Sequence, residues 1–220
     1  MRALVIGASG GIGGAVCLGL RARGWEMVGL SRSADGLDVT DEAAVARVLG
    51  AVEGAFDLTF VATGGLEVGG FRPEKSVKAL DGAAMAAQFA LNAIGPALVL
   101  KHVWRMVPRD RPAKVAVLSA RVASIGDNRL GGWHGYRAAK AALNQIVRTC
   151  AVELARTHPQ AALVALHPGT VSTPLTAAYA GGHPTVTPEV AAENLLRVLE
   201  GVGPAQSGQF FDWKGEVVPW

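Results

Sequence analysis

A short apolar run followed by a glycine-rich loop opens the chain, and no other feature constrains its fold as much. Residues 3–6 read Ala-Leu-Val-Ile, and the loop at 7–14 reads Gly-Ala-Ser-Gly-Gly-Ile-Gly-Gly. Apolar residues then recur at helical spacing until Gly24. A continuous apolar run favours a strand that is buried on both faces of a parallel sheet.

The loop between this strand and this helix predicts a phosphate site. Backbone without side chains lets a pyrophosphate approach the unpaired N–H groups at the N-terminus of the helix. The spacing is Gly-x-x-x-Gly-x-Gly and not the commoner Gly-x-Gly-x-x-Gly, so a plain tight turn is the alternative. The candidate contacts are Gly7, Ser9, Gly10, Gly11, Ile12 and Gly13.

The residues after the second expected strand, at 26–30, bear on the choice of cofactor. An acidic residue here would bind the adenosine ribose of NAD, but the sequence continues Ser31-Arg32-Ser33. Arg32 offers the fork geometry that suits a phosphate, which favours NADP over NAD; a solvated surface arginine is the alternative. We expect Asp38 and Val39 to line the adenine pocket at a very short third strand, and Thr40 to cap the next helix.

Strands and helices alternate along the rest of the chain. We expect strands at 56–62, 114–118, 161–166 and 208–213, and helices at 83–106, 136–157 and 187–199. This alternation predicts an α/β chain with a doubly wound parallel sheet between two layers of helices, a three-layer α/β/α arrangement in a single domain, 1–220. Ser119 stands at a strand end, where reacting groups collect, whereas His167 is interpreted as a structural strand-end residue.

A proline interrupts the long apolar helix at 83–106. Pro96 cannot donate a hydrogen bond to the carbonyl of Asn92, and its ring disfavours that turn. The freed carbonyl can serve a water or a ligand; a kink that serves packing alone is the alternative.

Tyr136 and Lys140 lie four residues apart in a helix-forming segment. That spacing places the phenol and the ammonium group on one face of a helix. The lysine charge favours phenolate, so we expect a pKa of Tyr136 below its usual value of about 10. Without further context, a solvated surface pair is the ordinary explanation of this spacing.

Composition limits the classes of function. The chain has 220 residues, half of them apolar, and a formal charge of +3 with scattered basic residues, which does not indicate a nucleic-acid surface. Cys17 and Cys150 show neither metal-ligand spacing nor a disulfide framework, so the cytoplasm is expected. No run reaches the roughly 18 apolar residues of a membrane span, and the short N-terminal run is a poor signal core, so we expect a soluble protein.

The glycine loop and Tyr136-x-x-x-Lys140, in this order after the first and the fifth major strand, resemble the short-chain dehydrogenase/reductase family. The resemblance runs from Arg2 to the C-terminus. It is nearest to the branch of C-factor signalling proteins and small carbonyl reductases, and it implies a Rossmann fold. It also implies that Tyr136 is the general acid or base, that Lys140 binds the nicotinamide ribose, and that the main-chain carbonyl of Asn92 holds a relay water. Further cofactor contacts are implied at Ala62, Thr63, Gly64, Pro168, Gly169, Val171 and Thr173.

Three positions depart from the family pattern. The usual Asn-Asn-Ala-Gly is Val61-Ala62-Thr63-Gly64, which removes a structural side-chain link. Ala120 stands where the family has the serine that binds the substrate oxygen. Ser119 is next to it and is the candidate catalytic serine, Ser124 further along the loop is the alternative, and a site with neither serine is the third possibility. Gly10 replaces a basic residue that is common in relatives that prefer NADP.

The leading hypothesis is an NADP(H)-dependent reductase of ketones or aldehydes that also oxidises alcohols. The alternative from another class is a nucleotide-binding signalling protein with little or no catalysis; a nucleotide-sugar epimerase or dehydratase is a third. We expect a small-molecule substrate, a lid at about 174–187, a pocket that includes Trp133, His134 and the segment 175–179, and a homo-oligomer, dimer or tetramer.

Overall fold

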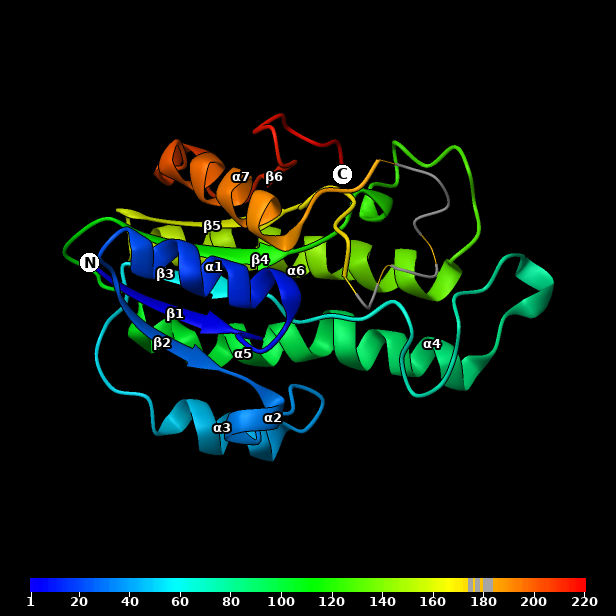
Figure 1. Cartoon of the computed structure of the whole chain (residues 1–220), viewed down its shortest axis with the longest axis horizontal. Coiled ribbons are helices and arrows are strands. Elements are labelled where there is room, and N and C mark those ends of the chain that lie inside the picture. Colours follow the sequence, from blue (N-terminus) through cyan, green and yellow to red (C-terminus); the bar gives the residue numbers. More distant parts are fainter. Residues whose placement is uncertain (174–175, 177–178, 180–183) are drawn as a thin grey trace.

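Six parallel strands form one sheet in the computed structural model, which describes residues 1–173, 176, 179 and 184–220 (Figure 1). The strand order is β2-β1-β3-β4-β5-β6. The strands are β1 (Arg2–Ile6), β2 (Glu26–Leu30), β3 (Leu58–Val61), β4 (Ala113–Leu118), β5 (Ala161–Leu166) and β6 (Phe210–Phe211). The predicted doubly wound parallel sheet in a single domain is confirmed.

Helices cover both faces of the sheet. Helices α1 and α7 pack against each other on one face, and α3, α5 and α6 contribute to the core of the opposite face, where α4 packs on α6 (Figure 1). The helices are α1 (Gly11–Ala22), α2 (Arg32–Asp35), α3 (Glu42–Gly50), α4 (Gly82–Phe89), α5 (Gly95–Val103), α6 (His134–Thr157) and α7 (Pro188–Glu200). These layers are the predicted α/β/α arrangement.

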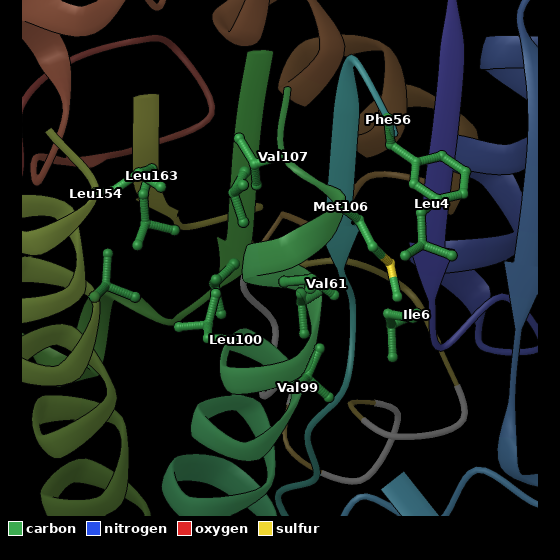
Figure 2. Close-up of a cluster of buried hydrophobic side chains, with 14 of the residues drawn as sticks. Leu4, Ile6, Phe56, Val61, Val99, Leu100, Met106, Val107, Leu154 and Leu163 are labelled. Atoms are coloured by element: carbon green, nitrogen blue, oxygen red, sulfur yellow. The ribbon is translucent and has the colours of Figure 1, made fainter. Parts of the chain in front are cut away.

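Apolar side chains from both faces of the strands fill two cores. Figure 2 shows the larger one, in which Leu4 and Ile6 of β1 and Val61 of β3 face Val99 and Leu100 of α5. All six residues of β5 are buried, as a strand that is covered by helices on both sides requires. Each large apolar side chain buried in this way contributes about 1.5–3 kcal/mol to folding.

The strand order reverses at β1. The chain leaves β1 for β2 on one side and returns to β3 on the other, so the loops after β1 and β3 diverge at their carboxyl ends. Such a crevice is where open α/β sheets bind their ligands. The glycine loop follows β1, and residues 62–65 follow β3, so both line it.

The long helix predicted at 83–106 is a composite of four segments. After α4, a π-helical turn (η2, Ala90–Ile94) leads into α5, and a 3₁₀ turn (η3, Trp104–Met106) ends the run. Pro96 follows the π-helical turn, so the predicted interruption is confirmed in position. By length and composition alone, the run Gly82–Met106 is sufficient to cross a membrane, contrary to expectation. The residues around Pro96 stay helical instead of ending the run, and its segments contact α3, α6 and β3, as a core helix does.

Three local predictions were wrong. Asp38 and Val39 form no strand, because the Asp38 carboxylate instead accepts hydrogen bonds from the backbone N–H and the hydroxyl of Thr40. Asp41, and not Thr40, caps α3 by accepting from the N–H of Ala43. Because the strand expected at Asp38-Val39 is missing, Tyr136 follows the fourth strand along the chain and not the fifth. The last strand is confined to Phe210–Phe211.

Candidate active site

The glycine loop turns so tightly that no side chain would fit at Gly7 or Gly13. Gly7 has a φ of +88°, which is unfavourable for any residue with a Cβ. A Cβ at Gly13 would lie 2.1 Å from the carbonyl oxygen of Gly7. Helix α1 begins at Gly11, and its N-cap, Gly10, supplies no side-chain hydrogen bond. The first N–H groups of α1 are thus available to an anion.

Two adjoining hollows form one cleft along the carboxyl ends of the strands. One, of about 450 Å³, contains Tyr136 and Lys140, and the other, of about 530 Å³, contains Arg32. Both share the middle of the cleft, which is lined by Ser9, Gly10, Ala62, Thr63, Gly64 and Gly65. The Thr63 hydroxyl is buried there with no hydrogen-bond partner among the described residues. The bare backbone and this free hydroxyl fit a dinucleotide that extends through both hollows.

The structure brings most of the predicted cofactor contacts into this cleft. The Tyr136 half includes Gly11, Ile12, Gly13, Pro168, Gly169, Val171 and Thr173, and the Arg32 half includes Gly7, Asp38 and Val39. Hydrogen bonds from Thr40 hold the pKa of the Asp38 carboxyl below its usual value. Arg32 is exposed at the rim of its hollow.

Helix α6 carries Tyr136 and Lys140 into the same hollow. The Lys140 side chain is buried, and its Nζ donates to the carbonyl oxygen of Leu118 at 3.0 Å. Burial lowers the pKa of Lys140 to about 8. Burial also raises the pKa of Tyr136 to about 12, opposite to the direction predicted from the sequence. Desolvation of the phenolate is the largest influence on the pKa of Tyr136, and the spacing of residues in a sequence does not reveal burial.

Asn92 lies behind the cleft and supports its floor. The side chain is fully buried in η2, where its Oδ1 accepts from the N–H of Gly65 at 3.0 Å and its Nδ2 donates to the Gly65 carbonyl at 2.8 Å. A further bond joins Nδ2 to Oε1 of Gln88 at 2.7 Å. Asn92 thereby fixes the loop after β3. Its side chain does not belong to the described lining of either hollow.

Neither candidate serine directs a free hydroxyl into the cleft. Ser119 lines the cleft, but its Oγ donates to Oδ1 of Asn144 on α6 at 2.7 Å. Ser124 is 1% exposed and accepts from the N–H of Asp127, away from the described cleft lining. Ala120 lines the cleft with a methyl group.

A model of the short chain dehydrogenases matches residues 1–182. The chain belongs to this family.

Two curated relatives resemble this short-chain dehydrogenase over much of its length. C-signal of Myxococcus xanthus is 36% identical over 142 residues, which are 64% of this chain and 81% of that protein. The 1-hydroxy-2-glutathionyl-2-methyl-3-butene dehydrogenase of Rhodococcus sp. strain AD45 is 30% identical over 230 residues, 99% of this chain and 98% of that one. These similarities place the chain among oxidoreductases.

A solved structure supports the fold of this short-chain dehydrogenase over its full length. The short-chain dehydrogenase/reductase from Burkholderia multivorans, solved with bound NADP, has a TM-score of 0.82 and 26% identity. The match covers 100% of this chain and 99% of that one. A Rossmann-type, single-domain oxidoreductase fold is therefore confirmed.

The sequence did not reveal how the dehydrogenase holds the start of its Tyr136 helix. Trp133, the N-cap of α6, makes no side-chain cap and has a left-handed φ of 51°. Instead Glu74, 7% exposed in the loop after β3, accepts from the N–H of Gly135 through Oε2 at 3.2 Å and from the N–H of Trp133 through its carbonyl. A carboxylate at a helix N-terminus is stabilised by the helix dipole. No local sequence signal links residue 74 to residue 135.

Aromatic side chains form a wall beside the phenol. The Trp133 ring meets the ring of Tyr136 edge-on at 6.3 Å and that of Tyr179 at 5.8 Å. The hydroxyl of Tyr179 donates to the carboxylate of Glu67. The expected pocket residues Trp133 and Tyr179 therefore meet next to Tyr136.

The predicted lid at 174–187 is described only in part. Residues 174–175, 177–178 and 180–183 lie outside the described residues. Val186 pairs with Val171 in a parallel bridge, and Thr187 caps α7 as predicted. The lid stays a prediction.

Proposed function

We propose that the chain is an NADP(H)-dependent reductase of ketones or aldehydes that also works in reverse as an alcohol dehydrogenase. The observation that carries this proposal is that Tyr136 and Lys140 line the same cleft as the glycine loop. When bound, the nicotinamide supplies or accepts the hydride. The Rhodococcus relative is named as a dehydrogenase of a hydroxy compound, which supports alcohol and carbonyl chemistry.

NADP is proposed over NAD on two grounds. Arg32 lines the end of the cleft where an adenosine ribose would lie, next to the hydroxyls of Ser31 and Ser33. Guanidinium and hydroxyl groups suit a phosphate, whereas an NAD site usually offers a carboxylate to the ribose. The NADP bound by the Burkholderia protein agrees with this choice.

Tyr136 is proposed as the proton donor in the reduction. With a pKa near 12 the phenol is protonated at neutral pH, which is the state that reduction of a carbonyl requires. Lys140, with a pKa near 8, carries its proton for most of the time at pH 7 and would hold the ribose hydroxyls. The carbonyl of Asn92, within the π-helical turn, is proposed to hold the water that returns a proton.

We also propose that the protein is a cytoplasmic homo-oligomer with a small-molecule substrate. Ile94 in the π-helical turn and Val152 on α6 are 52% and 46% exposed, and a second subunit that covered them would bury apolar surface. Light scattering tests this expectation, and a monomer at micromolar concentration would contradict it.

Turnover of NADPH with a panel of aliphatic and aromatic ketones and aldehydes tests the proposed activity. We expect oxidation of NADPH with at least one carbonyl, and weaker oxidation of NADH. Tight NADPH binding together with no turnover on the whole panel would contradict a reductase.

A second candidate function is nucleotide-dependent signalling with little catalysis. Ala120, which deprives the cleft of a hydroxyl, and the similarity to C-signal favour it. Tyr136→Phe separates the two functions, because a binding protein should keep its cellular role without the phenol, whereas a reductase should lose it.

A further inference from the structure

The substrate oxygen needs a hydrogen-bond donor besides Tyr136. A carbonyl oxygen gains negative charge as it is reduced, and a preorganised donor stabilises that charge. Ala120 offers none, and Ser119 donates to Asn144. Lys140 donates to Leu118, and its remaining N–H groups are assigned to the ribose hydroxyls. Thr173 and Thr176 bond to each other at 3.2 Å. Three other polar side chains line the described Tyr136 hollow, Ser9, Thr63 and His167. Ser9 and Thr63 also line the Arg32 hollow, in the middle of the cleft where the dinucleotide is expected, so His167 is the donor left for the substrate oxygen.

Strand register places His167 beside Ser119, one residue before the position that lacks the hydroxyl. Strands β4 and β5 pair with Leu118 opposite Leu166, and the N–H of Ser119 continues the ladder to the Leu166 carbonyl at 2.8 Å. His167 therefore follows β5 at the level where Ser119 and Ala120 follow β4. The imidazole and the methyl group of Ala120 both line the Tyr136 hollow.

The environment of the ring selects which nitrogen can donate. Nδ1 is buried and has no hydrogen-bond partner among the described residues. A buried N–H without a partner is rarer and costlier than a buried lone pair, so the neutral ring should carry its proton on Nε2. Because Nδ1 is enclosed, Nε2 is the nitrogen that remains for the cleft. Burial lowers the pKa of His167 to about 4, and of its charged neighbours Asp212 raises it and Arg121 lowers it.

We propose that the imidazole of His167 donates the hydrogen bond to the substrate oxygen that a serine hydroxyl at position 120 would otherwise supply. This inference rests on the proposed reductase activity. The neutral ring holds and orients the carbonyl, and Tyr136 remains the group that transfers the proton.

Removal and rescue of the donor test this role. The assay uses NADPH and the ketone of the panel with the highest kcat/KM. We expect His167→Leu to lower kcat/KM by about a hundredfold, as loss of one oxyanion donor does. His167→Gln, which keeps an N–H donor, should lose less. Adding Ala120→Ser to the His167→Leu variant should raise its kcat/KM at least tenfold. The same substitution in the wild type should change kcat/KM less than threefold.

Readouts other than turnover separate this role from a structural one. The Kd for NADPH, followed by its fluorescence, and the melting temperature should stay unchanged in His167→Leu. The alcohol product should bind the NADPH complex of this variant at least tenfold more weakly. His102→Leu, which changes a half-buried histidine on α5 outside the described cleft lining, is the matched control and should keep the Kd for NADPH and the Kd for the alcohol product.

Two outcomes would overturn the inference. One is an active wild type whose His167→Leu variant stays within threefold of it. The other is an Ala120→Ser substitution that raises wild type and variant by the same factor. A wild type without carbonyl turnover would instead remove the proposed function, and this inference with it.

Discussion

The hydroxyl of Ser119 donates to Oδ1 of Asn144 at 2.7 Å, on the side of the sheet that α6 covers. This contact joins the end of β4 to the helix that carries Tyr136. We therefore expect Ser119→Ala to lower the free energy of unfolding by about 1–2 kcal/mol, because a buried amide loses its partner. Urea unfolding measures this change.

Catalysis by the same variant distinguishes a structural from a catalytic serine. Since the Ser119 proton is directed to Asn144, kcat should fall by less than about fivefold. A loss of about a hundredfold with unchanged stability would instead identify Ser119 as the donor to the substrate oxygen.

Arg32→Ala should change the choice of cofactor. Loss of a guanidinium that contacts a phosphate is expected to raise the KM for NADPH by at least about tenfold, while the KM for NADH stays within about twofold. Arg47→Ala on α3, also an exposed arginine but outside the described cleft lining, is the control and should alter neither value. Equal effects on NADPH and NADH would show that Arg32 does not distinguish the two cofactors.

Glu74→Gln should loosen the start of the catalytic helix. Glu74 is buried against Gly135, so loss of its charge at the α6 N-terminus should cost about 0.5–2 kcal/mol of stability. We expect kcat to fall together with stability while the Kd for NADPH is kept. Glu67→Gln, an exposed carboxylate of the same loop, should leave stability within about 0.5 kcal/mol. A Glu74→Gln variant as stable and active as the wild type would refute this capping role.

The lowered pKa of His167 predicts that the protein loses stability in mild acid. Its pKa is about 4 in the folded chain and 6.5 when unfolded, so the unfolded state binds more protons between these values. The free energy of unfolding should thus fall as the pH drops from 6.5 to 4, by up to about 3 kcal/mol from this group. His167→Gln should show a smaller fall over that range in urea titrations. Parallel curves for the two proteins would contradict the burial of this imidazole.

Features whose causes are local were predictable from the sequence. Strands β2 and β5 have the predicted bounds, and Thr187-Pro188 starts α7 as its cap and first residue indicate. The glycine loop fixed the fold class because a strand, a bare turn and a helix follow one another within 22 residues.

Features that depend on distant partners were not predictable. The pKa of Tyr136 follows from burial that α6 acquires only by packing, and the pairing of Ser119 with Asn144 joins residues 25 positions apart. The strand expected at Asp38-Val39 does not form, because the Asp38 carboxylate accepts hydrogen bonds from Thr40. The pattern of apolar residues does not predict these bonds. The role of Glu74 arises from a contact across 61 positions.

The turnover of Tyr136→Phe tests the proposed reductase most directly. The variant keeps the ring that packs against Trp133 and loses only the hydroxyl that holds the proton. We expect kcat/KM for the carbonyl substrate to fall by at least about a hundredfold, within the range that general acid catalysis supplies, with an unchanged Kd for NADPH. A variant that binds NADPH normally and turns over within threefold of the wild type would contradict Tyr136 as the proton donor.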